Sequence, residues 1–294
     1  MPTPADLAEL VRAPAALSVP GDVVAGAAAA GALDRRVPAL AGTSVLLYWA
    51  GMAANDWADR ELDAAERPER PIPSGRVTAG AALGLSAGLT VAGLALAGLA
   101  GGRRALTVAV PLAGAVWAYD LWAKNTPAGP AVMAACRGLD VLLGASGGRL
   151  SRAVPAAVTV AAHTYTVTAL SRREVHGATR ELPTATLAGT AAVAVAAAAT
   201  GPARRDSDVG PEPVRGLVAA TLAGWYALRY GAAQARVLAD PGAAQVRSAV
   251  GAGITGLPAL QGALVARAGA PMLGAVVAAA APLGRRLARW VSPT

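Results

Sequence analysis

Charged residues are scarce in this sequence, and cysteine is nearly absent. Only 15% of the 294 residues are charged and 54% are hydrophobic, whereas about a quarter of a soluble domain is charged. A soluble fold cannot hide that much apolar surface, because a large share of its residues must face water. The single cysteine, Cys136, excludes an intrachain disulfide and a cysteine-rich metal site. The composition therefore favours a membrane protein.

Apolar runs of about 20 residues, the length that a spanning helix needs, follow one another along the chain. No period-two alternation persists, so helices are the expected way across a bilayer. We predict an all-α fold, a transmembrane bundle of nine or ten helices in a single domain over residues 1–294. The expected spans are 15–33, 37–54, 78–100, 104–123, 128–147, 153–171, 183–201, 215–235 and 248–266, with 270–284 as a tenth span or an interfacial helix.

Basic residues outnumber acidic ones, 26 to 18, but they lie in short clusters between apolar runs. This pattern favours loops that set topology and contact lipid head groups or an anionic substrate, and it argues against nucleic acid. With a cytoplasmic N-terminus, connections 55–77 and 171–182 share the inner side with Lys124 and 236–247. Nine spans leave more basic residues outside than inside. Ten spans move Arg285, Arg286 and Arg289 inside and reverse the balance, which favours ten spans or a C-terminal helix on the inner surface. The expected location is the cell membrane, with the edge at 55–77 facing the cytoplasm.

An acidic stripe follows the second apolar run. Asn55, Asp59 and Asp63 are spaced i, i+4, i+8 and share one helical face, with Asp56 beside them. Such oxygen ligands repel one another unless a cation lies among them, and they suit Mg²⁺, which also binds substrate phosphates. The next loop carries Arg67, Arg70 and Arg76, whose guanidinium groups match phosphate oxygens. The combination indicates a Mg²⁺–diphosphate site; the alternative is a solvated loop whose acids and arginines pair with each other.

These motifs resemble the UbiA-type intramembrane prenyltransferases. Asn55-Asp-x-x-Asp-x-x-x-Asp63, followed by Arg67-Pro-x-Arg-Pro-Ile-Pro-Ser-Gly75, is similar to that family's first aspartate-rich motif and loop. Tyr119-Asp120 with Lys124-Asn125 resembles its Tyr-Ser … Leu-Lys segment. The resemblance implies helices around a central cavity, Mg²⁺ on Asn55, Asp59 and Asp63 with support from Asp56, and diphosphate contacts from Arg67, Arg70 and Lys124.

The second motif departs from the family. Where that family has two or three aspartates, this chain reads Ser171-Arg-Arg-Glu-Val-His-Gly177. Glu174 is the metal ligand expected there and His176 is a second candidate, while Arg172 and Arg173 stand where carboxylates are expected. Either the arginines replace one metal site as diphosphate clamps, or the chain binds a lipid diphosphate without normal turnover. The segment also resembles a divergent, EboC-like branch of the superfamily.

Three of the ionisable residues inside or at the ends of the expected spans are candidate site residues. Arg137 and Asp140, three residues apart, either neutralise each other or line the cavity, with Arg137 toward the diphosphate and Asp140 toward the acceptor. Asp120 and Asp140 are the carboxylates expected to stabilise a prenyl cation or deprotonate the acceptor. His163 and Tyr165 are expected to be packed, hydrogen-bonded side chains.

The resemblance implies Mg²⁺-dependent transfer of a prenyl group from an isoprenyl diphosphate to a lipophilic, membrane-associated acceptor. No obligatory protein partner is evident from the sequence. The competing hypothesis is a lipid-diphosphate carrier or flippase on the same scaffold. A transporter of small solutes has less support, because the polar residues cluster at one rim.

Overall fold

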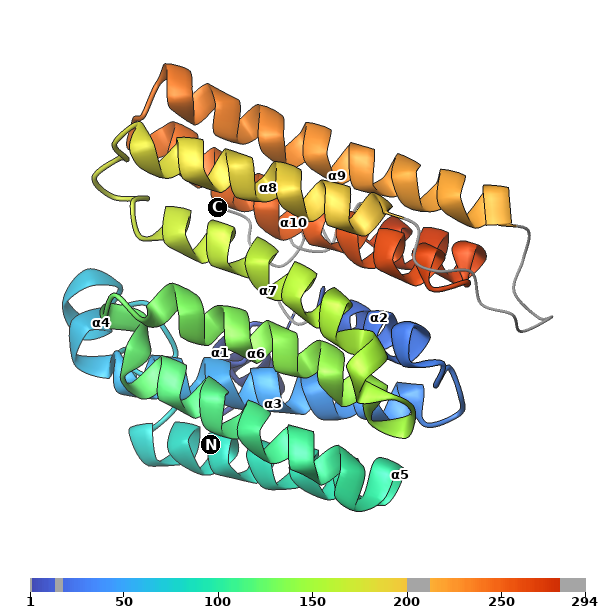
Figure 1. The fold of residues 1–294 in the computed structure, drawn as a ribbon. Helices are drawn as coiled ribbons and strands as arrows, with labels where there is room; N and C mark the ends of the chain where they lie inside the picture. Colours follow the sequence, from blue (N-terminus) through green and yellow to red (C-terminus); the bar gives the residue numbers. More distant parts are fainter. Residues whose placement is uncertain (1, 14–17, 200–211, 281–294) are drawn as a thin grey trace.

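The computed structural model describes residues 2–13, 18–199 and 212–280, and within these ranges the chain is helical, as predicted (Figure 1). The helices, in chain order, are α1 (Pro4–Leu10), α2 (Pro20–Ala30), α3 (Val37–Ala58), α4 (Arg60–Glu66), α5 (Ala79–Leu121), α6 (Gly129–Gly144), α7 (Leu150–Ser171), α8 (Glu181–Ala198), α9 (Glu212–Ala239) and α10 (Ala243–Arg267), with 3₁₀ turns η2 (Ala123–Asn125) and η3 (Ala145–Gly147). A shorter apolar helix covers Pro271–Ala280.

Five described helices, α3, α5, α7, α8 and α10, are long and apolar enough to cross a membrane. α5 spans 43 residues and contains one non-helical position, Gly102, with φ 60° and ψ −150°. Glycine adopts a positive φ without steric cost, so the chain reverses there. The predicted runs 78–100 and 104–123 are therefore the two arms of a hairpin (Figure 1).

The predicted span 15–33 is a shorter helix in the structure. α2 has 11 residues, about 16 Å at 1.5 Å per residue, whereas the hydrocarbon core of a bilayer is about 30 Å thick. Proline at its first position suits a helix start, and Gly31, with φ 72°, ends it. Several positions used in the prediction lie outside the described residues: 15–17, 200–201, 281–284, Arg285, Arg286 and Arg289.

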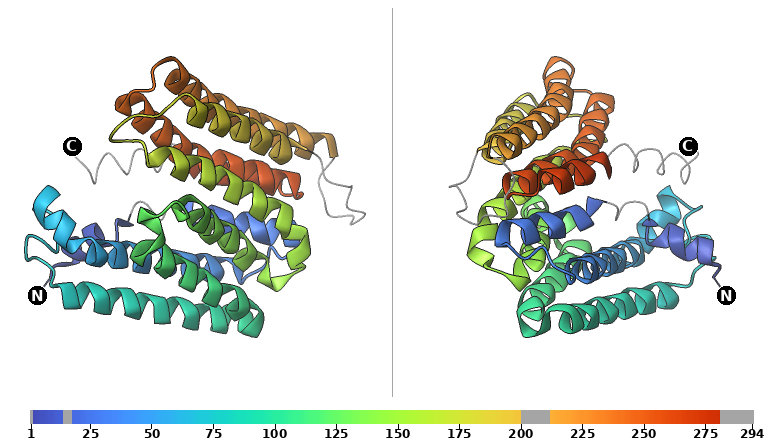
Figure 2. Two further views of the ribbon diagram at one scale, coloured as in Figure 1. Left: turned by 60° about the vertical axis from the view of Figure 1, so that its left-hand side comes forward. Right: turned by 90° about the vertical axis from the view of Figure 1, so that its right-hand side faces the viewer.

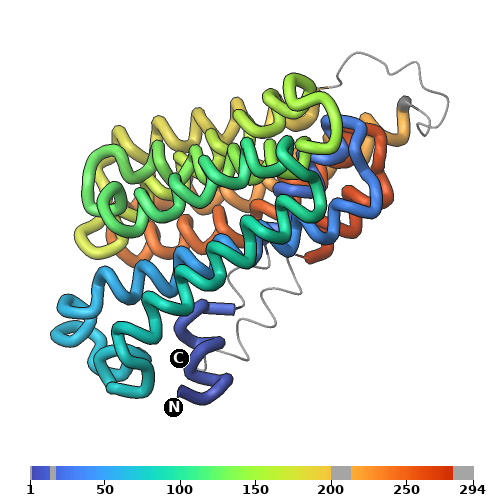
Figure 3. The backbone as a smooth tube through the Cα atoms, turned by 90° about the horizontal axis from the view of Figure 1, so that it is seen from below, coloured from blue at the N-terminus to red at the C-terminus, as the bar shows by residue number. Residues whose placement is uncertain are grey.

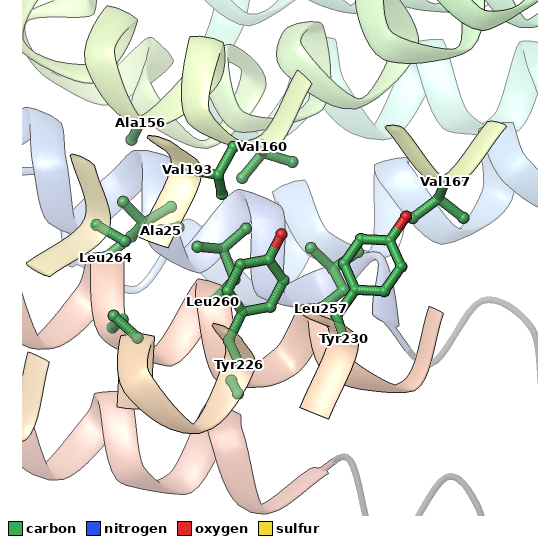
Figure 4. Packing of buried hydrophobic residues seen from close by; sticks show 14 of the residues in the cluster. Ala25, Ala156, Val160, Val167, Val193, Tyr226, Tyr230, Leu257, Leu260 and Leu264 are labelled. Atoms are coloured by element: carbon green, nitrogen blue, oxygen red, sulfur yellow. The ribbon is translucent and has the colours of Figure 1, made fainter. Parts of the chain in front are cut away.

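The helices form two groups, with α2, α3, α5 and α6 in one and α7 to α10 in the other (Figures 1 and 2). The larger core lies among α7, α9 and α10 (Figure 4), where Tyr226 and Tyr230 are fully buried. α2 lies between the groups, because it packs against α6 of its own group and against α7 and α10 of the other. Glycines let it touch α6 backbone to backbone. A Cβ atom added to Gly144 would lie 1.9 Å from the carbonyl oxygen of Val23, the close approach typical of membrane helices.

Four connections meet at one end of the bundle, at the left of Figure 1 and again in Figure 3: α4 with the loop after it, η2, the α7–α8 loop and the α9–α10 turn. Hydrogen bonds join them, since Arg172 donates to the carbonyl of Lys124 (3.2 Å) and Arg247 donates to that of Glu174 (2.8 Å). We call this end, residues 55–77, 122–126, 171–182 and 236–247, the rim. The structure brings together the connections that the sequence places on one side.

Candidate active site

The acidic stripe begins in the last turn of α3 and continues into α4. α3 ends at Ala58 and α4 begins at Arg60, with Asp59 between them. The Asp59 amide donates to the Asn55 carbonyl (2.9 Å) and the Asp63 amide donates to that of Asp59 (2.8 Å). Because the i to i−4 pattern survives the break, Asn55, Asp59 and Asp63 keep the spacing of a helical stripe.

Asp56 and Asp63 are paired with arginines. Arg70 lies 2.6 Å from the Asp63 carboxylate and 3.6 Å from that of Asp56, and Arg12 lies 2.8 Å from Asp56. The two carboxylates are only 6% and 5% exposed, and buried charges need such partners. Pairing between acids and arginines is what the alternative interpretation, a solvated loop without a metal site, predicts. Arg12, however, comes from outside the loop.

Lys124 reaches the other half of the stripe. Its ammonium group lies 2.7 Å from the Asp59 carboxylate and donates to the Asn55 side-chain oxygen at 3.0 Å. η2 carries this lysine directly after the C-terminus of α5. An amide oxygen and a carboxylate therefore converge on one cation at the rim.

The donor chemistry of the stripe fits Mg²⁺. Among the described residues, no three histidine, cysteine or acidic side chains form a metal cluster. Mg²⁺ needs fewer, because it commonly binds through one or two carboxylates and completes its shell with water and substrate phosphates. Asn55 with Asp59, and Asp56 with Asp63, each already hold a cationic group between two oxygens.

Glu174 lies in the α7–α8 loop, away from these contacts. Its carbonyl accepts a hydrogen bond from Arg247, and partial burial raises the pKa of its carboxyl. Nothing in the described structure joins it to the acidic stripe.

The remaining rim arginines differ in their surroundings. Arg67 and Arg173 are exposed. Arg172 donates to two backbone carbonyls, those of Lys124 and Thr126, so it fixes the α7–α8 loop to the loop that presents Lys124. Arg76 lies 2.7 Å from both Asp6 and Glu9 and attaches α1 to the loop after α4.

A small cavity lies one helical turn inside the rim. It has a volume of about 30 Å³ and is lined by Tyr48, Gly51, Met52, Val116, Tyr119, Asp120, Met133 and Cys136 from α3, α5 and α6. Asp120 is 7% exposed. A Cβ atom on Gly51 would lie 2.9 Å from its carboxylate, so the glycine makes room for the acid.

Arg137 and Asp140 do not form the ion pair that their spacing suggested. Arg137 lies 2.7 Å from Asp22 of α2 and over the Tyr48 ring at 5.5 Å. Asp140 instead accepts a hydrogen bond from Ser44 of α3. Neither residue contacts the rim in the described structure, and neither lines the cavity.

His163 and Tyr165 have different surroundings. The His163 ring is buried and shares a hydrogen bond of 2.8 Å with the Tyr226 hydroxyl, as expected of a packed side chain. Tyr165 is 50% exposed, so the expectation of a packed tyrosine was wrong. It lies on the outer face of α7.

The polar partners that were missed in the sequence include Arg12, Asp22, Ser44 and Gln261. The Gln261 side chain donates to Asp22 (2.6 Å) and to the Ser18 carbonyl (2.7 Å). Asp22 stood inside the expected span 15–33, and an ionisable residue in an apolar run is itself a signal.

The UbiA prenyltransferase family matches residues 17–200. Digeranylgeranylglyceryl phosphate synthase of Methanothrix thermoacetophila is 46% identical over 85 residues, which are 29% of this chain and 31% of that protein. The synthase of Halobacterium salinarum strain R1 is 36% identical over 156 residues, 50% of this chain and 54% of that protein. The chain thus matches between about a third and about half of the length of these relatives.

Two solved structures share the fold. One, described as structural and mechanistic insights into the biosynthesis of digeranylgeranylglyceryl phosphate synthase in membranes, has a TM-score of 0.66 at 17% identity and covers 91% of this chain and 98% of that one. The other, the apo structure of a UbiA homolog from Aeropyrum pernix K1, has a TM-score of 0.63 at 17% identity and covers 85% and 96%. The family match extends over more than half of the chain, and the apolar helices agree with it. The chain is a multi-pass membrane protein that belongs to the UbiA prenyltransferase family.

Proposed function

We propose that the protein transfers a prenyl group from an isoprenyl diphosphate to a lipophilic, membrane-associated acceptor, with Mg²⁺ as cofactor. The observation that carries the proposal is the rim constellation, in which three carboxylates and three cationic side chains meet beside a cavity. Family membership supports it, as do relatives whose name describes geranylgeranyl groups on a glyceryl phosphate. Membership of the chain in an EboC-like branch of the superfamily remains a prediction.

Asn55 and Asp59, with Asp56 and Asp63, are the residues that would hold Mg²⁺. The ion supplies positive charge that stabilises a leaving diphosphate. Lys124 and Arg70 already lie among these carboxylates, so both can bind phosphate oxygens at the same place. Glu174 has at most a minor part, because it lies away from the stripe.

The exposed arginines, Arg67 and Arg173, cover the anion from the rim. Arg172 acts by holding the α7–α8 loop against the loop of Lys124. Arg137 is bound to Asp22 inside the bundle, so its part is to support Tyr48 on the cavity wall rather than to contact diphosphate.

In the proposed reaction, the bond between the first prenyl carbon and the diphosphate oxygen breaks and its electron pair leaves with the diphosphate. The apolar walls of the cavity keep water from the allylic cation. Tyr48 and Tyr119 line that cavity, and aromatic faces attract cations. Asp120 lies on the cavity. Asp140 accepts a hydrogen bond from Ser44 and does not line the cavity, so of the two carboxylates Asp120 is the better placed to act on an acceptor.

We also propose that the protein lies in the cell membrane with its rim in the cytoplasm. The test is labelling of Arg67→Cys and Arg103→Cys in intact cells with a membrane-impermeant maleimide, in a Cys136→Ser background. Arg67 lies on the rim and Arg103 at the Gly102 reversal. The proposal requires labelling of Arg103→Cys alone, and labelling of Arg67→Cys alone would reverse the orientation.

A second candidate, a lipid-diphosphate carrier, is favoured by the lack of clustered carboxylates in the α7–α8 loop. Purified protein is incubated with radiolabelled isoprenyl diphosphates, Mg²⁺ and candidate acceptors, and diphosphate release is followed. Asp34→Ala, which changes an exposed acid at the opposite end of the bundle, is the matched control. Diphosphate release that is abolished by Asp59→Ala and unchanged by Asp34→Ala supports the enzyme. Tight Mg²⁺-dependent binding without release under any acceptor supports the carrier.

A further inference from the structure

Exposed arginines gather at the end of the bundle opposite the rim. Three connections meet there, at the right of Figure 1: the α2–α3 loop (31–36), the reversal of α5 (101–104), and η3 with the start of α7 (145–152). Each connection carries two arginines, and all of these arginines are exposed. We call them the arginine cluster: Arg35, Arg36, Arg103, Arg104, Arg149 and Arg152.

η3 and the residues after it bring the three connections into contact. On one side, the amide of Arg149 donates to the carbonyl of Ala30, at the end of α2, at 3.4 Å. On the other side, a Cβ atom added to Gly101 would lie 3.5 Å from the Ser146 hydroxyl of η3. The three pairs of arginines therefore belong to one continuous surface.

The arginine cluster has a large excess of positive charge. Within the part of the chain that the structure describes, its six guanidinium groups make no ion pair and no hydrogen bond. The same connections contain one acid, Asp34, whose carboxylate accepts from the amide of Arg36 at 2.8 Å. At the rim, by contrast, Asp56, Asp59 and Asp63 each lie against a cationic side chain. Like charges repel one another, so the cluster favours an anion.

Exposed apolar side chains lie beside each pair of arginines. Leu33 precedes the first pair, Leu99 precedes the second, and Leu150 and Val154 follow the two arginines of the third connection; all four are exposed, and Leu99 is 86% exposed. α3, α5 and α7 are long and apolar enough to cross a membrane, so their ends lie at the level of the lipid head groups. A soluble anion would cover the arginines alone, whereas a lipid would cover the arginines and the apolar side chains.

We propose that the arginine cluster binds the head group of an anionic phospholipid, whose acyl chains lie on the apolar side chains beside it. Guanidinium groups donate in pairs to phosphate oxygens. A basic residue near an anionic membrane surface strengthens binding by a factor of about five. The bound phosphate neutralises the three connections and holds them together. The proposal concerns the end away from the acidic stripe and does not depend on the proposed transfer function.

The experiment uses the purified full chain in a neutral detergent. Phosphatidylglycerol, which is anionic, and phosphatidylcholine, which is zwitterionic, are titrated separately, and bound lipids are counted by native mass spectrometry. Phosphatidylglycerol should bind with the higher affinity. An excess of inorganic phosphate should not displace it, because phosphate lacks the acyl chains.

A double variant, Arg104→Gln with Arg149→Gln, removes one charge from each of two connections. It should bind phosphatidylglycerol about 25-fold more weakly, a factor of about five for each arginine. Arg104→Lys with Arg149→Lys keeps both charges and should lose less. The matched control is Arg180→Gln with Arg236→Gln, two exposed arginines of the rim that have an acid within four residues, and it should bind the lipid like the wild type.

Thermal unfolding in detergent without added lipid shows whether a variant is folded. The replaced arginines are exposed and unpaired in the described structure, so the double variant should unfold at the temperature of the wild type. Added phosphatidylglycerol should raise that temperature in the wild type and in the control, and much less in the glutamine variant.

Three results would overturn the proposal. Equal affinity for the two lipids would reduce the surface to unspecific contact with acyl chains. Displacement of the lipid by inorganic phosphate would make the cluster a site for a soluble anion. Equal losses in the glutamine variant and in the rim control would show that the lipid responds to the total charge of the protein and not to this cluster.

Discussion

The ion pair between Arg137 and Asp22 leads to a sharp prediction about stability. The Arg137 side chain is 7% exposed and that of Asp22 is fully buried, with 2.7 Å between their charged groups. The other carboxylate oxygen of Asp22 accepts from Gln261 at 2.6 Å. Arg137→Met removes the cation and leaves Asp22 with a single amide donor in a low-dielectric interior.

Removing one partner of a buried ion pair typically costs about 3–5 kcal/mol, because a charge remains uncompensated. We therefore expect Arg137→Met to lose stability of that order. Asp22→Asn added to Arg137→Met should restore most of it, since the neutral amide can still accept from Gln261. A pair that is replaced as a unit is often nearly neutral in stability.

The assay is unfolding in mixed micelles by titration with sodium dodecyl sulfate, followed by tryptophan fluorescence. Arg152→Met, an exposed arginine at the opposite end from the rim, serves as the control and should unfold like the wild type. The reasoning fails if Arg137→Met is as stable as the wild type, or if the double variant is destabilised by the sum of the two single changes.

Three further predictions concern other parts of the molecule. Asp59→Ala should abolish Mg²⁺-dependent diphosphate binding and Glu174→Ala should weaken it far less; equal losses would contradict the loss of the second metal site. Gly144→Ala should destabilise the protein in the same micelle titration by at least the 1–3 kcal/mol or so of an overpacked core, because its Cβ would lie 1.9 Å from a backbone oxygen of α2. Hydrogen bonds from Thr3, and after them the hydrogen bond from Arg76, lower the pKa of Asp6 from 3.8 to about 2. Since a lowered pKa stabilises the fold only above the unfolded value, α1 should stay docked above pH 3.8 and loosen as the pH falls toward 2, which hydrogen exchange of α1 amides can measure against Asp6→Asn.

The stripe and the helices were predictable because their signals are local. Apolar runs of spanning length marked the helices, and the i, i+4, i+8 spacing placed Asn55, Asp59 and Asp63 on one face through the break at Asp59. The length of an individual helix was less predictable, as α2 shows. α2 stops at Gly31 because a left-handed residue ends it, and it begins at a proline inside an apolar run that offers no other boundary.

The partners of the buried charges could not be read from spacing. Arg137 and Asp140 are three residues apart, yet each binds a residue on another helix, Asp22 and Ser44. The Arg12–Asp56 contact likewise joins positions 44 residues apart. Helix packing decides such contacts, and packing depends on which glycines allow two backbones to approach, so the charge pattern of one segment does not determine them.

The charge balance of the rim leads to a final prediction. The three carboxylates Asp56, Asp59 and Asp63 are matched by Arg12, Arg70 and Lys124, so the cluster has no net charge to attract an anion. A diphosphate without a metal competes with these carboxylates for the same cationic groups and should bind weakly. With Mg²⁺ present the carboxylates have another partner, so each ligand should strengthen the other, by the 5–150-fold that is typical of coupled sites. Calorimetric titration of a diphosphate analogue with and without Mg²⁺, and of Mg²⁺ with and without the analogue, must give the same factor. Tight analogue binding in the absence of any divalent cation would show that the arginines alone hold the diphosphate and that the acidic stripe is structural.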